Sequence, residues 1–519
     1  MVSLRKWVGI SGACLGAFMA CLDASVTSAS LKVIQGALGA SMDEATWISS
    51  SYRIAELIVV PVTPWLARIL STRLYMLASA ILFVLCSAGC ASATDFSTLV
   101  IMRIMQGLTG GALIPLALTA IFTELPDESR PTGMAVYGLI ASLAPTAGPW
   151  VGGWITDNCG WQYLFYINFL PGIAMSLAIW WGLSGQPFDL DGLRKGDWCG
   201  ILSLAIFLGS LEVVLEEGTR LNWWGSPLIV CLAIVAGVFF LAWLFIELTI
   251  PSPFVKLRLL HGRSFAAANI IGFTTYLAIS GSYYVLSVCL QEVQNFSPGQ
   301  VGSVIMWGGS MQLIMVPLAV WLMKRFDDRL LLFLGCAGFA GSALMNAQMT
   351  NLTGLDQLVL SQAVRGVAQP LITITLSSVA LRTIDRADGG NASALYTMIR
   401  YLGSSIGVSL STEFIQWREH LHSQRLGAFV QFNSPKTQAR LAQMTEYFMS
   451  LGVDPTAAAR QALSLLGKIV RRESYIMAFA DAFAFIALVV LLVGASVCLC
   501  VSKKPQPEKI ERNSLPQAT

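Results

Sequence analysis

Long apolar runs, separated by short polar or charged segments, recur along the whole chain. Most runs reach about 20 residues, enough for an α-helix to cross the hydrocarbon core of a bilayer. The alternating pattern of a membrane β-barrel does not occur. The pattern predicts an all-α membrane protein with fourteen transmembrane helices, at residues 8–30, 45–67, 74–93, 97–122, 133–156, 162–184, 198–217, 227–249, 265–292, 300–323, 330–350, 357–380, 391–415 and 474–500.

Basic residues are concentrated in alternate loops. If the N-terminus is cytoplasmic, the cytoplasmic segments hold most of these residues, and the short external loops hold only Lys32 and Arg220. Short loops rich in Lys and Arg stay in the cytoplasm, whereas long loops cross the membrane largely regardless of charge. We therefore expect both termini in the cytoplasm and the long connection 416–472 on the outer side.

The chain contains an internal repeat. Residues 57–68, LIVVPVTPWLAR, match residues 313–324, LIMVPLAVWLMK, at six of twelve positions, and a basic residue closes both. Chance similarity of apolar runs is the alternative, but a shared Pro, Trp and basic residue favour duplication. The predicted organisation is an N-terminal six-helix bundle at 1–184, two inserted transmembrane helices with their loops at 185–264, a C-terminal six-helix bundle at 265–500 that includes the outer loop, and a cytoplasmic tail at 501–519.

The composition excludes several classes of protein. Hydrophobic residues make up 55% and charged residues only 12% of the chain, about half the charged share of a soluble protein. The net charge of +3 gives no nucleic-acid footprint. Three histidines, with no HExxH or zinc-spaced cysteine pair, argue against a metal site, and the missing P-loop argues against ATP hydrolysis. No cofactor is expected.

Four ionisable residues lie inside the first predicted spans at a similar depth: Asp23, Arg53, Glu56 and Arg103. Charges within a membrane are costly and are usually functional. One interpretation is a permanent charge network that holds the N-terminal bundle together. The other is a proton relay, with Asp23 or Glu56 as the carrier and Arg103 as the electrostatic partner.

Further polar and aromatic residues are candidates for a substrate cavity between the two bundles. Arg365 and Arg400 are either structural or exposed to that cavity. Glu212 lies in the inserted pair, outside both bundles, so a structural role is favoured for it. Aromatic side chains suit an apolar ligand pocket. The candidate cavity residues are Arg400, Arg365, Glu212, Tyr283, Tyr284, Tyr137 and Tyr396.

Three segments carry a resemblance to a known family. GPWVGG at 148–153 is similar to the GPxxGG motif of the EmrB-type 14-helix drug:proton antiporters of the major facilitator superfamily. RIMQG at 103–107 resembles the family's RxxQG segment, and Asp23 matches the first-span Asp of its LDxTIxNVAxP segment, although Ser28 and Lys32 replace the usual Asn and Pro. The resemblance covers about residues 8–500. The residues assigned to the antiporter motif are Pro145, Gly148, Pro149, Gly152 and Gly153; close packing in an ordinary span is the alternative role of such glycines.

The resemblance implies proton-coupled export of amphipathic small molecules, such as a drug, toxin, fatty acid or metallophore, by alternating access across the bacterial inner membrane. It also implies two partners, a periplasmic adaptor and a TolC-type outer-membrane channel. The loop 416–472 is the docking candidate, with short amphipathic helices expected at 437–448 and 456–470; an uninvolved loop is the alternative. A proton symporter for nutrient uptake, a lipid-modifying membrane enzyme and a sensor on the same fold are rival interpretations.

Overall fold

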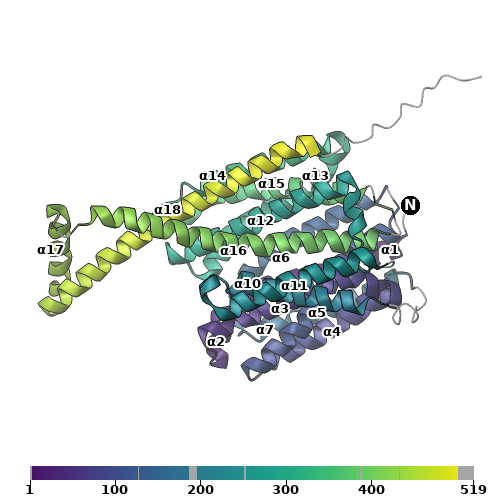
Figure 1. Ribbon diagram of the computed structural model, residues 1–519, viewed down its shortest axis with the longest axis horizontal. Coiled ribbons are helices and arrows are strands. Elements are labelled where there is room, and N and C mark those ends of the chain that lie inside the picture. Colours follow the sequence, from purple (N-terminus) through teal and green to yellow (C-terminus); the bar gives the residue numbers. More distant parts are fainter. Residues whose placement is uncertain are drawn as a thin grey trace, which may run out of the picture.

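The computed structural model describes residues 3–126, 128–185, 196–250, 253–382, 384–385, 388–431 and 433–500. All regular elements within these ranges are helices. The helices lie side by side in a bundle, and an arm projects from the end opposite the N-terminus (Figure 1). We call these the arm end and the N-terminal end. The predicted tail 501–519 lies outside the described residues.

The N-terminal half follows the predicted spans closely, with one interruption. The predicted helix 162–184 is broken at Ile167 and Asn168 into a single turn and a longer helix. A short additional helix, α2, connects the first two long helices. The elements are α1 Leu4–Ala29, α2 Leu31–Leu38, α3 Met42–Leu70, α4 Thr72–Ala91, α5 Phe96–Glu124, α6 Arg130–Asn158, α7 Tyr163–Tyr166 and α8 Phe169–Gly182.

The inserted pair and the C-terminal half continue the helical pattern. Pro227 and Pro298 stand at the starts of α11 and α13, where the missing amide hydrogen of proline leaves no bond unmade. The elements are α10 Trp198–Glu217, η1 Trp223–Gly225, α11 Pro227–Thr249, η2 Leu257–His261, α12 Arg263–Glu292, α13 Pro298–Arg325, α14 Asp328–Asn346, α15 Leu355–Arg382, α16 Gly389–Phe429, α17 Pro435–Ser450 and α18 Pro455–Cys500.

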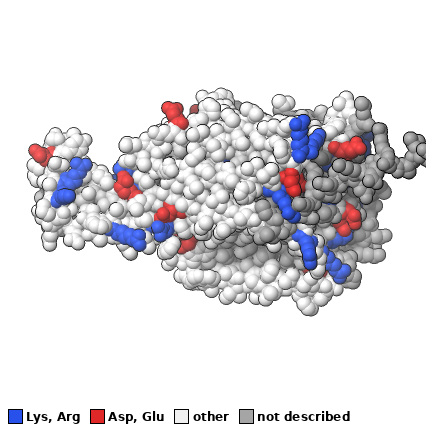
Figure 2. All heavy atoms as spheres, turned by 90° about the horizontal axis from the view of Figure 1, so that it is seen from above, with Lys and Arg blue, Asp and Glu red and all other residues white. Residues whose placement is uncertain are grey.

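The charged side chains are distributed as expected for a bundle that crosses a membrane. In the view of Figure 2, charged side chains gather on the arm and at the N-terminal end, and few lie on the belt between them. Among the described residues, eleven helices are long and apolar enough to cross a bilayer. The remaining predicted spans are α3, α6 and α16, which have 29, 29 and 41 residues. These helices pack between the two halves, α6 against α13 and α3 against α16.

The two halves are in contact at the N-terminal end. Gly389 and Gly390 begin α16 so close to the other half that an added Cβ would lie 3.5 Å from Phe122 and 3.7 Å from Pro64. Lys256, after the inserted pair, forms an ion pair of 2.5 Å with Asp388 at the same end. Helices of the two halves therefore touch at this end.

The arm is helical throughout most of the predicted loop. Helix α16 continues past the predicted end at residue 415, and α17 connects it to α18 (Figure 1). The expected helix 437–448 corresponds to α17, but the expected separate helix 456–470 is wrong, because it is the first part of the 46-residue α18. Hydrogen bonds from Thr456 hold the pKa of Asp454 below its usual range, so this residue caps α18 as a carboxylate. Arg418 and His422 of α16 both bond Asp481 of α18 at the base of the arm, at 2.7 and 2.6 Å.

Candidate functional site

Asp23 and Arg103 form a buried ion pair between α1 and α5. Their side chains are 0% and 1% exposed. Arg103 binds Oδ2 of the Asp23 carboxylate. The other oxygen, Oδ1, accepts hydrogen bonds from Gln106 Nε2 at 2.9 Å and Asn168 Nδ2 at 2.7 Å. The break between α7 and α8 places Asn168 beside Asp23, so a polar residue within an apolar segment supplies one of the hydrogen-bond donors. Each Asp23 oxygen thus has at least one donor in this conformation.

The guanidinium of Arg103 is also enclosed. Its Nε donates to the Ile48 carbonyl at 3.1 Å and one terminal nitrogen donates to Gln106 Oε1 at 2.7 Å. The Tyr52 ring lies 4.2 Å from its central carbon, and the Tyr52 hydroxyl bonds the Ala20 carbonyl at 3.0 Å. This cluster, which we call the Asp23 network, joins α1, α3, α5 and the α7–α8 break. Of the four ionisable residues proposed from the sequence it contains Asp23 and Arg103, and it does not include Arg53 or Glu56.

The second half of the repeat lacks the arginine of this network. Leu99, Val100 and Gly107 of α5 match Leu358, Val359 and Gly366 of α15 at an offset of 259 residues, and at this offset Gln362 stands for Arg103. Arg365 is 1% exposed, and none of its side-chain nitrogens has a hydrogen-bond partner among the described residues. Its guanidinium lies 3.8 Å from the centre of the Tyr283 ring. Tyr284 is half-buried against the apolar core.

Glu56 makes a direct contact between the two halves. The hydroxyl of Tyr401 on α16 donates to Glu56 Oε1 on α3 at 3.1 Å. Glu56 is half-buried, whereas Arg53, three residues earlier, is exposed. Of the four ionisable residues predicted to lie at one depth, Asp23 and Arg103 therefore form a pair, and Glu56 contacts the opposite half.

Beside this contact lies Arg400, surrounded by tyrosines. Its guanidinium carbon is 4.0 Å from the centre of the Tyr276 ring and 5.2 Å from that of Tyr396, and Tyr137 and Tyr401 also act on its charge. Arg400 is 6% exposed, its Nε has no hydrogen-bond partner, and no carboxylate of the described residues forms an ion pair with it. We call Arg400 and these four tyrosines the tyrosine box. Tyr137 comes from α6 of the N-terminal half, so both halves contribute.

Comparison with known sequences places the chain in a family. Residues 13–408 match the family described as Major Facilitator Superfamily. The chain belongs to the major facilitator superfamily. It is 29% identical over 493 residues to the "Colistin resistance protein EmrB" of Acinetobacter baumannii, covering 94% of this chain and 95% of the relative. It is 30% identical over 440 residues to the "Multidrug export protein EmrB" of Escherichia coli, covering 83% and 84%. The predicted EmrB-type resemblance is confirmed.

Solved structures confirm the major facilitator fold. The human organic anion transporter MFSD10 matches with a TM-score of 0.58 at 14% identity, covering 94% of this chain and 100% of that one. The proton:xylose symporter XylE matches with a TM-score of 0.59 at 14% identity, covering 97% of both chains. At this identity the likeness concerns the fold alone, and the chain is a multi-pass membrane protein of this superfamily.

The GPWVGG segment lies on α6 and packs this helix against two others, α1 and α13. A Cβ added at Gly148 would lie 2.4 Å from the Cβ of Ser25, and one at Gly152 would lie 2.8 Å from the Val26 carbonyl, both on α1. Gly153 faces Gly299 of α13 in the other half, and a Cβ at Gly302 would meet Pro149 at 3.0 Å. The segment therefore packs α6 against the helix of Asp23 and against the opposite half. The side chain of Pro145 lies outside the described residues.

Gly148→Ala should destabilise the protein by about 1–3 kcal/mol, because the new methyl group overlaps Ser25 and forces α1 and α6 apart. Gly341→Ala on α14 is the matched control, since nothing lies within 4 Å of the added Cβ. Thermal unfolding of the purified proteins in one detergent measures the difference. Equal midpoints for the two variants would contradict close packing at Gly148.

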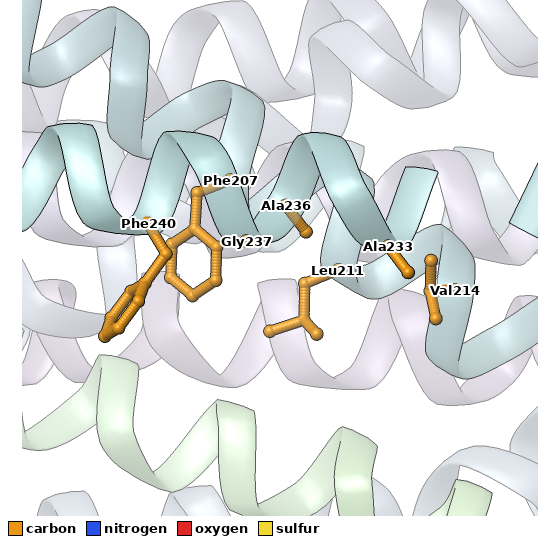
Figure 3. Close-up of a pocket in the computed structure, with 7 residues that line it drawn as sticks. All are labelled: Phe207, Leu211, Val214, Ala233, Ala236, Gly237 and Phe240. Carbon is orange, nitrogen blue, oxygen red and sulfur yellow. The ribbon is translucent and has the colours of Figure 1, made fainter. Parts of the chain in front are cut away.

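An open groove on the surface is lined by apolar residues and lies apart from the Asp23 network and the tyrosine box. It has a volume of about 310 Å³, lies between α10 and α11, and is lined only by apolar residues, including Phe207, Leu211 and Phe240 (Figure 3). The Phe207 and Phe240 rings lie 5.0 Å apart. Helix α11 is largely exposed and almost wholly apolar, so this groove suits the hydrocarbon of the surrounding bilayer.

Proposed function

We propose that this chain exports amphipathic small molecules in exchange for protons, by alternating access between its two halves. The observation that carries the proposal is the Tyr401–Glu56 hydrogen bond, which joins an ionisable acid of the N-terminal half to Tyr401 of the tyrosine box on α16 of the C-terminal half. The names of relatives support it: they are called colistin resistance, multidrug export and, in Neisseria gonorrhoeae, fatty acid resistance proteins.

Proton exchange at Glu56 would change the contact between the halves. An ionised Glu56 is a stronger acceptor for the Tyr401 hydroxyl than a protonated one, since hydrogen bonds to charged groups are stronger. Protonation therefore weakens one tie between α3 and α16, and deprotonation restores it. Because Arg400 precedes Tyr401 on the same helix, a ligand at Arg400 and a proton at Glu56 act on the same stretch of α16.

We propose the bacterial inner membrane as the location, with both termini cytoplasmic and the arm in the periplasm. A periplasmic adaptor linked to a TolC-type channel would then dock on the arm. Large apolar side chains are exposed on it: Phe429 is 83%, Tyr447 59% and Leu451 62% exposed. Such residues in water indicate a protein contact. Copurification of the full chain with its adaptor, compared with a variant lacking residues 431–454, tests this placement.

Transport by the purified chain in liposomes tests the exchange itself. With the liposome interior acidic, a substrate dye should accumulate inside when the transporter is oriented as in inverted cell membranes, and a protonophore should abolish the accumulation. Dye movement that follows protons in the same direction would instead support the symporter interpretation. The fold permits both, because XylE is a proton:xylose symporter.

Arg400→Gln should weaken binding of an anionic amphiphile about tenfold or more, because a charge-assisted bond to the headgroup is lost. Decanoate, decanol and decyltrimethylammonium share one tail length, so their binding to the transporter in lipid nanodiscs isolates the headgroup. The exposed Arg258 gives the control Arg258→Gln. An equal loss for all three ligands would show that Arg400 supports the fold rather than an anionic headgroup.

A further inference from the structure

Helix α10 of the inserted pair contacts both halves. Helix α10 packs against α3 of the N-terminal half and α16 of the C-terminal half. The Thr46 hydroxyl on α3 bonds Glu217 of α10 at 3.0 Å, and Trp223 Nε1 bonds Glu413 of α16 at 2.8 Å. The insertion therefore spans the seam between α3 and α16, the same seam that holds Glu56 and Tyr401.

Glu212 is a buried acid on this seam. It is 3% exposed, its Oε1 accepts a hydrogen bond of 2.6 Å from the Ser405 hydroxyl of α16, and its Oε2 has no hydrogen-bond partner among the described residues. The charged groups near it are Glu216 on the same helix, α10, and Arg53 and Glu56 on the neighbouring α3. Arg53 is exposed and forms no ion pair with Glu212.

A buried carboxylate without a paired cation is unfavourable, and uptake of a proton removes the charge. The unpartnered Oε2 is the atom available for that proton. Both oxygens would otherwise need donors in a dry environment, and only Oε1 has one. The geometry of Glu212 therefore suits a group that is neutral when the seam is closed.

The position of Glu212 connects the arm end with Glu56. It lies five residues before the end of α10, which corresponds to about 7.5 Å at the rise of an α-helix. The exposed Glu216 lies one turn nearer the arm end. Ser405 lies one turn from Tyr401 on α16, so a single helix donates to Glu212 and to Glu56.

We propose that Glu212 is a second proton-binding site of this transporter, located on the inserted pair between the arm end and Glu56. A proton from water at the arm end binds the Glu212 carboxylate before the seam closes over it. When the halves separate, Ser405 withdraws and the proton leaves to Glu56 or to water. This assignment rests on the proposed proton-coupled function, and it gives the insertion a role in coupling.

Infrared spectroscopy of the transporter in lipid nanodiscs tests proton binding without any substrate. The wild type should show the carbonyl band of a protonated carboxyl group that titrates with pH. Glu212→Gln should remove this band, and Ser405→Ala should shift its frequency because the hydrogen bond to Oε1 is lost. A spectrum of Glu212→Gln identical to that of the wild type throughout the titration would overturn the proposal.

Proton-driven dye transport in liposomes provides the second readout. Glu212→Gln should reduce the change in rate per pH unit at least threefold, whereas Glu247→Gln should leave it as in the wild type. Glu247 is the matched control, since it is 4% exposed on the neighbouring α11 and accepts a bond from the Val255 backbone, away from the seam. An unchanged pH profile in Glu212→Gln would overturn the role in coupling. A wild type without proton-driven transport would refute the proposed function alone, because the infrared result does not depend on transport.

Discussion

Arg103→Ala should destabilise the N-terminal half by about 3–5 kcal/mol, because it leaves the carboxylate of Asp23 buried without its cation. The loss includes the bond to the Ile48 carbonyl and the contact with the Tyr52 ring. We expect low yield and a lower unfolding midpoint in detergent. The exposed Arg258 supplies the control Arg258→Ala, which should unfold like the wild type.

A double variant separates the cost of an unpaired charge from other effects of the substitution. Asp23→Asn combined with Arg103→Gln removes both charges and keeps polar side chains, so much of the stability should return. If the double variant is stable but transports without regard to pH, the Asp23 network takes part in coupling. If Arg103→Ala unfolds at the wild-type midpoint, the ion pair does not hold this half together.

The sequence predicts the long helices well because a bilayer imposes a length and a composition on each span. It does not predict the helix break at Asn168, because one Asn within an apolar run does not interrupt the hydropathy pattern. Nor does the pattern show that this Asn bonds Asp23. It also ends one span at residue 415 and begins the last one only at residue 474, although α16 continues to Phe429 and α18 begins at Pro455. Their polar extensions are stabilised by contacts with each other, which a hydropathy pattern cannot represent.

The candidate site is predicted in part, for a similar reason. Charges within apolar runs identify Asp23, Arg103, Glu56 and Arg400 one by one, because each is costly in a membrane. Which of them meet depends on helix packing, and similar depth alone would group Glu56 with Arg103. Tyr401 was not among the predicted residues, although it follows Arg400 directly and makes the contact between the halves.

Glu56→Gln should abolish proton-driven accumulation of substrate while substrate binding stays within about threefold of the wild type. The amide keeps the size and an acceptor for the Tyr401 hydroxyl, but it does not exchange a proton. We therefore expect downhill substrate movement to continue at a rate independent of pH. Dye flux in liposomes, with and without a pH gradient, measures both quantities.

Two comparisons assign this effect to Glu56. Glu446→Gln changes the same residue type on the exposed face of α17 and should transport like the wild type. Asp23→Asn removes the other candidate carrier, whose oxygens already accept from Arg103, Gln106 and Asn168. If Asp23→Asn loses proton coupling and Glu56→Gln keeps it, the carrier is Asp23, and the contact between Glu56 and Tyr401 serves only to hold the closed form. Loss in Glu56→Gln alone makes Glu56 the carrier, because its carboxylate is the one held by a single bond from the half that must move.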